Sequence, residues 1–524
     1  MGPNLPKQRI SHLVTGALAA LTGLAIFTSL AEPFVEGDFW GYLLLGRRIL
    51  ETGSLPTQTP YIYLISPRPY TNHNWVSSLL FTLIYTDLSP TALQIFRFLA
   101  GFATAGVLYK AARIRGAGRN SSLAMLFLTA VFFGSGFPPV LARMFSSFFF
   151  ALFLLILEMS RKRNDRRLLW WLPALGVAWA NLHMGLSMGL FLMFWYAIAE
   201  LGELSAQGIK DRRGLGASGK ILGKAAGFWL ALGLCTALAG TVTPYGWKLW
   251  VNFLTDVNAH PEDWGGEWMK MADALSTGFD LHLNLSFIVT LLATLLLAPV
   301  YLRRDVPALV NLSALTMTAF NFNRHASFFI LACSVYLPLA LDGLHRDLSR
   351  TRKSRNCKAY LTCVLLLLAL GGVQQTVLLV RHGAYVMRNG GPFAFQVADR
   401  PIEGSFQSSF YPVGAARFLA SRKTGGTVAT RPVWGSFLAY FTYPKYTVAA
   451  DGRFYEEFPR QTYNEYMRFM DGLDGWEIFL RHHPPDFVLC PAGSRLDLLL
   501  SAFPEFLEIY RDPFAAVFSS TQKK

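Results

Sequence analysis

The segment Ile10–Leu30, ISHLVTGALAALTGLAIFTSL, is followed after a few residues by Glu36-Gly37-Asp38-Phe39-Trp40. The first stretch is about as long as a helix that crosses a bilayer, and the second places two carboxylates and a tryptophan just beyond its end. Acidic side chains at a membrane surface are more typical of chemistry or ion binding than of anchoring. Together the two stretches predict a membrane protein with a candidate site beside its first span.

The composition indicates the same class of protein. Of the 524 residues, 52% are hydrophobic and only 15% are charged, which is too apolar for a soluble globule of this length. Apolar runs recur along the chain at lengths suited to a bilayer and predict about eleven spans embedded in membrane lipids. The expected spans are 10–31, 91–112, 120–138, 144–160, 168–182, 184–202, 225–243, 283–302, 306–322, 326–345 and 359–380.

The net charge of +15 has a topological origin. About half of the 48 Lys and Arg residues lie in short segments between apolar runs, and these segments contain few acids. The segments are Lys7 with Arg9, Lys110–Arg119, Arg161–Arg167, Lys210–Lys224, Arg303–Arg304 and Arg346–Lys358. This pattern is typical of cytoplasmic loops and gives no reason to expect a nucleic-acid partner. We therefore expect a multi-pass membrane protein, with its N-terminus inside and its C-terminus outside.

The chain divides by composition into two expected domains. Residues 1–380 form a transmembrane domain with a first outer loop at 32–90, and residues 381–524 form an outer, periplasmic α/β domain. In the second domain, short runs of β-favouring residues alternate with helical patterns, which predicts a partly parallel sheet. The expected strands are Thr427–Thr430, Tyr446–Ala450, Phe487–Cys490 and Ala515–Phe518, and the expected helices are Val413–Arg422, Phe458–His482 and Arg495–Tyr510.

Polar and ionisable residues recur at the outer ends of the expected spans. They are Glu36, Asp38, His73, Arg97, Arg143, Asn181, His183, Glu267, Asn323, Arg324 and His325. Singly, each has an ordinary interpretation: an arginine can anchor a helix at the interface, an asparagine or histidine can cap one, and a loop acid can be solvated. Ionisable groups at membrane depth are costly, and their gathering at one face favours a functional site.

The chemistry open to this set is narrow. Arginines at the lipid boundary can bind a phosphate with two parallel hydrogen bonds. An opposing carboxylate can take a proton from an acceptor hydroxyl as a general base. Glu36, Asp38 and Glu267 could instead bind a divalent cation such as Mg²⁺ or Mn²⁺, because carboxylates are hard oxygen ligands. A mechanism without a metal fits the same residues.

These motifs resemble the GT-C superfamily of lipid-linked-sugar glycosyltransferases, and more closely a bacterial group of predicted GT-C membrane proteins. In that group the first loop runs Asp-x-Trp-Trp, Gly-Arg-x-Ile-Leu, a proline-rich turn and His-Glu-Trp. The matching residues here are Asp38-Phe39-Trp40, Gly46-Arg47-Arg48-Ile49-Leu50, Leu55-Pro56 and His73-Asn74-Trp75. Further matches are Arg143, Asn181-Leu182-His183, Pro244-Tyr245-Gly246, Arg324, Trp434-Gly435 and Asp451-Gly452-Arg453.

The resemblance implies transfer of a sugar from a polyprenyl-phosphate carrier to a glycan, lipid or protein acceptor outside the membrane, with inversion at the anomeric carbon. Asp38 would be the general base, with Glu36 as its alternate. Arg143 and Arg324 would clamp the phosphate, while His73, His183, Arg97, Glu267 and His325 would contact substrate.

Two departures from the family pattern keep other interpretations open. Asn74 replaces the usual Glu of His-Glu-Trp, and Trp434-Gly435 replaces the longer Trp-Trp-Asp-Tyr-Gly of oligosaccharyltransferases. The alternatives are a non-catalytic membrane scaffold and a subunit for lipid or polysaccharide transport. A transporter should carry polar residues through the membrane depth, whereas here they gather at one face.

Overall fold

The computed structural model describes residues 5–64, 71–130, 133, 140–212, 215–258, 268–279, 281–348, 355–400, 410–452 and 458–521. The chain forms two compact units. The helical unit comprises Met1–Glu32, Gln94–Pro138 and Ala142–Phe393. The mixed unit comprises Pro33–Leu93, Pro139–Leu141 and Ala394–Lys524, so it joins the first loop to the C-terminal segment.

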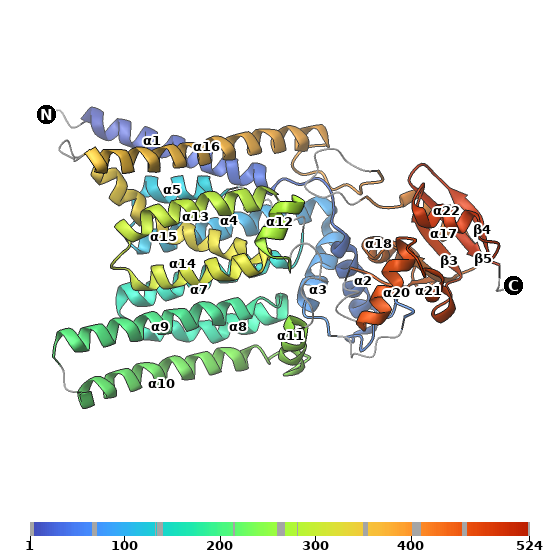
Figure 1. Cartoon of the computed structure of the whole chain (residues 1–524), viewed down its shortest axis with the longest axis horizontal. Helices are drawn as coiled ribbons and strands as arrows, with labels where there is room; N and C mark the ends of the chain where they lie inside the picture. The colour runs from blue at the N-terminus through green and yellow to red at the C-terminus, as the bar shows by residue number, and fades with distance from the viewer. Residues whose placement is uncertain are drawn as a thin grey trace. The chain divides into compact units, whose positions relative to one another are not determined.

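The helical unit is built of long helices that pack side by side, with shorter helices between them (Figure 1). They are α1 (Leu5–Leu30), α4 (Pro90–Ile114), α5 (Arg119–Leu128), α7 (Arg143–Arg163), η2 (Arg166–Trp170), α8 (Trp171–Leu182), α9 (Leu186–Lys210), α10 (Leu215–Ala239), α11 (Lys248–Asn258), α12 (Met271–Thr277), α13 (Leu281–Tyr301), α14 (Val306–Asn321), η5 (Asn323–His325), α15 (Ala326–Leu348) and α16 (Arg355–Arg388). Helices suit a membrane because every backbone polar group within them is satisfied internally.

In the described part of the chain, eight helices are long and apolar enough to cross a membrane, which confirms a multi-pass membrane protein. Each overlaps one of the expected spans, although α10 begins at Leu215 instead of 225 and α16 ends at Arg388 instead of 380. The remaining expected spans contain α5, α8 and α14, which have only 10, 12 and 16 residues. The number of spans and their orientation stay predictions.

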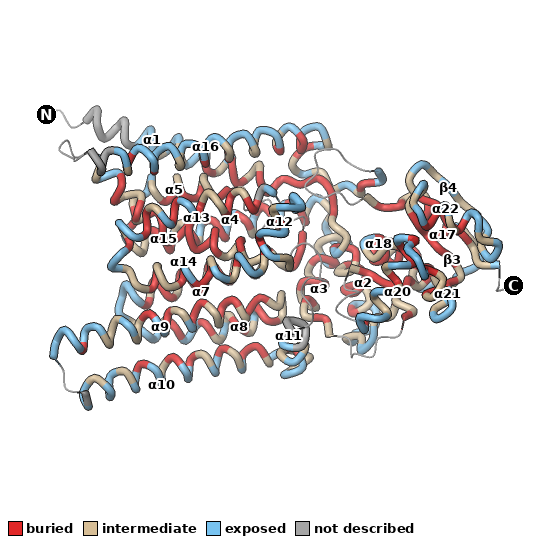
Figure 2. Tube along the Cα trace, in the orientation of Figure 1, coloured by how far each residue is buried: buried red, intermediate tan, exposed pale blue. Residues whose placement is uncertain are grey.

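Burial differs sharply among these helices (Figure 2). Of the eight, α15 has the largest buried share, because it is apolar on all sides and lies between neighbours. By contrast, α10 and α16 have the smallest buried share. On α10, the side chains of Leu230, Leu234 and Leu238 are exposed at a four-residue spacing that forms one stripe. A leucine stripe of this kind is the surface that a lipid-facing helix presents.

The mixed unit contains a five-stranded sheet with strand order β2-β1-β3-β5-β4. Its elements are α2 (Gly37–Thr52), α3 (Trp75–Leu83), η1 (Ile84–Leu88), α17 (Val413–Ser421), β1 (Gly426–Thr430), α18 (Pro432–Thr442), β2 (Tyr446–Val448), α20 (Arg460–Met470), α21 (Glu477–His482), β3 (Phe487–Pro491), α22 (Arg495–Ser501), β4 (Phe506–Arg511) and β5 (Ala515–Ser520). Strand β1 is parallel to β2 and β3, while β5 is antiparallel to β3 and β4. The partly parallel sheet is therefore confirmed.

One predicted helix in this unit is wrong in its second half. The expected helix Arg495–Tyr510 ends at Ser501, and β4 begins at Phe506. Pro504 explains the break, because proline and the residue before it disfavour a continuing helix. The expected helix Phe458–His482 is likewise two helices, α20 and α21, separated by a turn in which Gly472 has a φ of 62°.

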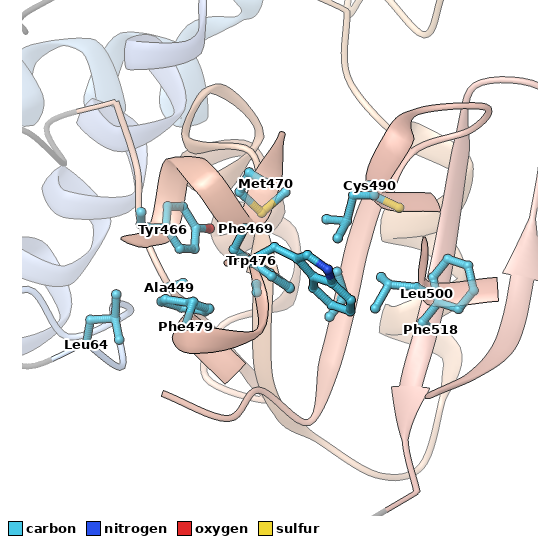
Figure 3. Packing of buried hydrophobic residues seen from close by; sticks show 14 of the residues in the cluster. Leu64, Ala449, Tyr466, Phe469, Met470, Trp476, Phe479, Cys490, Leu500 and Phe518 are labelled. Atoms are coloured by element: carbon cyan, nitrogen blue, oxygen red, sulfur yellow. The ribbon is translucent and has the colours of Figure 1, made fainter. Parts of the chain in front are cut away.

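The core of the mixed unit lies between the sheet and its helices (Figure 3). Tyr466 and Phe469 of α20 pack there with Phe518 of β5. Leu64, from the first loop, is buried in the same cluster. The first loop reaches this core because Ile62 pairs with Val448 in a parallel bridge at the β2 edge. The sheet edge is thus covered by a segment far away in sequence.

Candidate functional site

The acidic motif forms the start of helix α2. Glu36 is the N-cap residue, and Asp38 lies in the first turn. A helix N-terminus carries partial positive charge, so it favours the ionised carboxylate of Asp38. The side chain of Asp38 is exposed, Glu36 is partly buried, and Phe39 and Trp40 are fully buried. The motif therefore directs its aromatic residues into the unit and its acid outward.

Glycines let α2 lie close to α18 within the mixed unit. A Cβ added at Gly37 would lie 3.2 Å from the carbonyl oxygen of Val433, and one at Gly41 would lie 3.3 Å from Ser436 Oγ. The glycine of the Trp434-Gly435 motif is under a stronger restraint. A Cβ there would lie 1.9 Å from the carbonyl oxygen of Ala450, so a larger residue would push the backbone of α18 away from the backbone at Ala450. This contact sets α18 directly against the segment that follows β2.

That segment also lies beside Asp38. A Cβ added at Gly452 would lie 2.6 Å from Asp38 Oδ1, so the carboxylate rests directly beside the Gly452 backbone. The preceding residue, Asp451, is buried, and its Oδ2 accepts a 2.9 Å hydrogen bond from the hydroxyl of Tyr61. The Asp38, Trp434-Gly435 and Asp451-Gly452 motifs, widely separated in sequence, therefore meet in one place.

An aromatic cluster surrounds Trp40, two residues after Asp38. Trp40 contacts the rings of Phe437, Tyr440 and Tyr411, with the last ring centroid 6.2 Å away. The Tyr411 hydroxyl donates a 2.9 Å hydrogen bond to the carbonyl oxygen of Val35. Burial, with a further contribution from the charges of Glu36 and Asp38, raises the pKa of Tyr411 well above its ordinary value. Tyr411 is therefore a permanent hydrogen-bond donor and cannot act as a base at neutral pH.

Two other first-loop motifs have structural roles. A Cβ added at Gly46 would lie 2.3 Å from the carbonyl oxygen of Ser78, so this glycine allows α2 to cross α3 closely. Asn74 is the N-cap residue of α3, and its carbonyl oxygen accepts the backbone N–H of Ser78. His73 lies in the turn just before α3 and is partly buried.

His183 is placed by a polar group inside the helical unit. Helix α8 ends at Leu182, and His183 continues in extended backbone. Its Nδ1 lies 2.6 Å from Ser146 Oγ, and the same oxygen accepts a 2.8 Å hydrogen bond from Trp179 Nε1. The imidazole is therefore held at the end of α8 by a residue in the first turn of α7.

Arg324 and His325 lie in η5, just after α14, and contact aromatic rings. The Arg324 guanidinium lies 4.3 Å above the centre of the Trp268 ring. Trp268 also contacts the ring of His325, and the backbone N–H of Asn323 donates to the carbonyl oxygen of Met269. A backbone hydrogen bond and a cation–π contact thus join the segment before α12 to η5.

The other basic candidates also lie in the helical unit. Arg143 is the first residue of α7 and is partly buried, while Arg97 lies in α4 and is fully buried. Glu36, Asp38 and His73 belong to the mixed unit instead. The expectation that Asp38 shares one site with Arg143, His183 and Arg324 stays a prediction.

The described part of the structure contains no preformed cluster of metal ligands. Among those residues, no three His, Cys, Asp or Glu side chains form a group that could hold a metal ion. Glu267, the third expected ligand, lies outside the described residues.

Four residues that support the candidate site were not among the predicted site residues. Asp451 could have been included, because it stands in a motif that matches the GT-C group. Tyr61, Ser146 and Trp179 carry no local signal, and only tertiary packing brings each to its partner.

Comparison with known proteins identifies the fold. No protein-family model and no curated protein sequence matches the chain. Among solved structures, the oligosaccharyltransferase AglB from Archaeoglobus fulgidus, in complex with an inhibitory peptide and a dolichol-phosphate, is similar with a TM-score of 0.50 and 14% identity, over 97% of this chain and 74% of AglB. ArnT from Cupriavidus metallidurans, bound to undecaprenyl phosphate, is similar with a TM-score of 0.50 and 13% identity, over 97% of this chain and 98% of ArnT. The chain therefore shares the overall fold of these two proteins.

Proposed function

We propose that this protein is a GT-C glycosyltransferase that moves a sugar from a polyprenyl-phosphate carrier to an acceptor at the outer face of a bacterial inner membrane. The observation that carries the proposal is the likeness to ArnT over nearly the whole of both chains, because that ArnT structure holds undecaprenyl phosphate. AglB, the other similar protein, was solved with a dolichol-phosphate. A lipid phosphate is thus common to both.

In the proposed reaction, Asp38 accepts the proton of the acceptor hydroxyl. The acceptor oxygen forms a bond to the anomeric carbon as the bond from that carbon to the phosphate oxygen breaks. The polyprenyl phosphate leaves with the bonding electron pair, and a single displacement inverts the anomeric centre. Asp38 suits this role because its carboxylate is exposed at the N-terminus of α2. Glu36, partly buried at the N-cap, is the alternate base.

Arg143 and Arg324 are the proposed clamps for the carrier phosphate. The Arg324 guanidinium lies over the Trp268 ring, and its planar fork of N–H groups suits a phosphate. A phosphate binds along that fork with two hydrogen bonds, and the same contacts hold the charge of the departing phosphate. His73, His183, Arg97 and His325 are proposed to contact the sugar or the acceptor.

A divalent cation, if bound by Glu36, Asp38 and Glu267, would supply further positive charge beside the departing phosphate. Glu267 lies outside the described residues, and those described do not form a three-ligand group. The roles proposed here are those of the side chains.

Replacement of Asp38 by Asn tests the proposal. Asn preserves the size of the side chain but removes its basicity, so folding should survive while turnover falls by roughly 10²–10⁴-fold. Transfer is measured in membranes that contain equal amounts of each protein, with Asp87→Asn, an acid at the end of η1, as the control. Wild-type activity should be measured with and without EDTA, because a lost metal ligand would also abolish transfer. Equal transfer by the Asp38→Asn variant and the wild type would favour a scaffold or a transport subunit.

A further inference from the structure

The surroundings of Asp38 contain three residues that have no role in the reaction described above. Tyr61 and Asp451 form a buried hydrogen bond, and Gly452 lies against the Asp38 carboxylate. All three belong to the mixed unit, but Tyr61 comes from the first loop and the other two follow β2. Their arrangement connects the sheet to the acidic helix.

The connection begins with backbone pairing at the sheet edge. The N–H of Tyr63 donates to the carbonyl oxygen of Val448 at 2.9 Å, and the N–H of Val448 donates to the carbonyl oxygen of Tyr61 at 2.8 Å. This pairing adds the first loop to the edge strand β2 and fixes its register. Leu64, buried in the core cluster, prevents the loop from sliding.

Side chains extend the connection toward Asp38. Tyr61 is 1% exposed, so its hydroxyl can be directed only at a partner inside the unit, and that partner is Asp451. Asp451 is also 1% exposed, and burial of a carboxylate is costly without such hydrogen bonds. The hydrogen bond therefore locks the backbone at residue 451, and with it the position of Gly452.

Gly452 then determines where the Asp38 carboxylate can lie. A Cβ at this position would be only 2.6 Å from Asp38 Oδ1, closer than real Cβ contacts. The Gly452 backbone is outside the left-handed region, so an alanine would cause no backbone strain of its own. Its methyl group would displace the end of a flexible side chain, which costs little stability.

We propose that Tyr61, Asp451 and Gly452 are positioning residues that hold the Asp38 carboxylate where the acceptor hydroxyl reaches it. The catalytic consequence rests on the proposed function, whereas the positioning itself does not. Because a misplacement of about 1 Å can reduce turnover roughly 10²-fold, Gly452→Ala should lower kcat by roughly 10-fold to 10²-fold. The KM for the carrier should change little, and the melting temperature should fall by a small but measurable amount.

Two matched controls isolate the effect. Gly202→Ala, in helix α9, places a Cβ where no atom lies within 4 Å, and it should leave kcat unchanged. Tyr61→Phe removes the hydroxyl that holds Asp451, so it should lower both kcat and the melting temperature. Tyr63→Phe removes a buried hydroxyl with no hydrogen-bond partner in the described structure, so it should preserve both quantities.

The positioning is tested separately by a double-mutant cycle of thermal stability. Gly452→Ala is measured in the full-length wild type and in Asp38→Ala, where no carboxylate meets the new methyl group. The cost of Gly452→Ala should be smaller in the Asp38→Ala background. Equal costs in the two backgrounds would overturn the positioning, whatever the activity.

The transfer assay then tests the catalytic part. Coupled costs together with a wild-type kcat in Gly452→Ala would overturn the role of these residues in catalysis. If the wild-type protein transfers no sugar from a pool of polyprenyl-phosphate sugars, the proposed function fails. In that case the double-mutant cycle still decides whether Gly452 positions Asp38.

Discussion

The two ends of the helical unit both contain arginine but surround it with different residue types. One end, which we call the Arg115 end, holds Arg115, Glu158, Arg161, Glu203 and Asp305. The opposite end, the His183 end, holds Ser146, Trp179, His183, Trp268 and Arg324. Helix α7 contributes to both, with Ser146 in its first turn and Glu158 in its last part.

Charges at the Arg115 end are paired with opposite charges. Arg115 forms ion pairs with Glu158 at 2.6 Å and with Asp305, and Arg161 pairs with Asp305 at 2.8 Å and with Glu203 at 3.0 Å. These pairs join the segment after α4, helices α7 and α9 and the N-cap of α14. The Arg115 and Glu158 side chains are only 3% and 4% exposed, so this pair is inside the fold, whereas Arg161 and Glu203 are partly exposed.

Cationic and imidazole groups at the His183 end instead meet rings and hydroxyls. Arg324 stacks on Trp268, and His183 lies against Ser146. An ion pair neutralises the charge of an arginine, whereas a cation–π contact by itself does not. The Arg115 end is therefore suited to hold helices together, and our proposal that Arg324 binds the carrier phosphate gives the His183 end a different role.

The first prediction, with the largest expected effect, concerns the removal of the Arg115 side chain. Arg115→Met would leave Glu158 buried without its cation, and loss of one member of a buried pair typically costs about 3–5 kcal/mol of stability. We expect a large fall in the melting temperature of the purified protein. The matched change Arg324→Met, at the His183 end, should reduce it far less. Similar losses from the two variants would show that both ends serve stability alone.

The second prediction concerns anion binding at the His183 end. Arg324→Met should weaken the binding of undecaprenyl phosphate by about 1.5–3 kcal/mol, the usual value of hydrogen bonds to charged groups. This corresponds to roughly 10-fold to 150-fold in Kd. Arg324→Lys keeps the charge but loses the planar fork, so its Kd should lie between those of Arg324→Met and the wild type. Arg303→Met, at a basic loop between α13 and α14, is the control. An unchanged Kd in Arg324→Met would exclude this arginine as the clamp.

The sequence was sufficient to predict the fold class and the ends of most long helices. Continuous apolar runs and basic loops carry that information locally, which explains why α7 begins at Arg143 and α8 ends next to His183, as expected. The main error in the α/β region, at Arg495–Tyr510, arose because the helical pattern continued past Pro504. Antiparallel pairing of β4 with β5 determines the structure of that stretch.

The candidate site was less predictable because its supports are tertiary. Asp38 could be selected from its position after the first span. The closeness of Gly452 to Asp38 could not be inferred, since hundreds of residues separate them and no local pattern records the contact. Similarly, the Tyr61–Asp451 hydrogen bond depends on a first-loop segment that pairs with β2, and a single bridge leaves no strand-length signal in the sequence.

The third prediction uses the pH dependence of stability to test the ion pairs at the Arg115 end. Burial alone would raise the pKa of Asp305, but the charges of Arg115 and Arg161 outweigh it and lower that pKa below its ordinary value. A carboxyl group with a lowered pKa stabilises the folded state above the pKa of the unfolded chain, about 3.9, and this contribution is lost as the pH falls through the folded value. Asp305→Asn should therefore lower the melting temperature at pH 7. The difference from the wild type should shrink as the pH falls below about 4.

Asp273→Asn serves as the control for this experiment, because Asp273 lies in α12. A difference between Asp305→Asn and the wild type that stays constant from pH 7 to pH 3 would contradict an ion-pair origin of the stabilisation.

The smallest expected effect belongs to Ser146, the hydroxyl that holds His183. Trp179 Nε1 can only donate, so Ser146 Oγ accepts there and can give its own proton to His183 Nδ1. That arrangement keeps the imidazole proton on Nε2, on the side of the ring away from Ser146. Ser146→Ala should release the ring and leave the Trp179 N–H without its acceptor, at a cost of about 0.5–1.5 kcal/mol.

In transfer assays we expect Ser146→Ala to lower kcat/KM by roughly 2-fold to 12-fold and to change the pH profile, because the imidazole is no longer confined to one tautomer. Ser147→Ala removes a neighbouring hydroxyl from the same helix and should leave the profile unchanged. A purely structural role for Ser146 would lower the melting temperature but keep the wild-type pH profile. That result would remove His183 from the proposed substrate-binding set, and the His183 end would then depend on its arginines alone to receive the carrier phosphate.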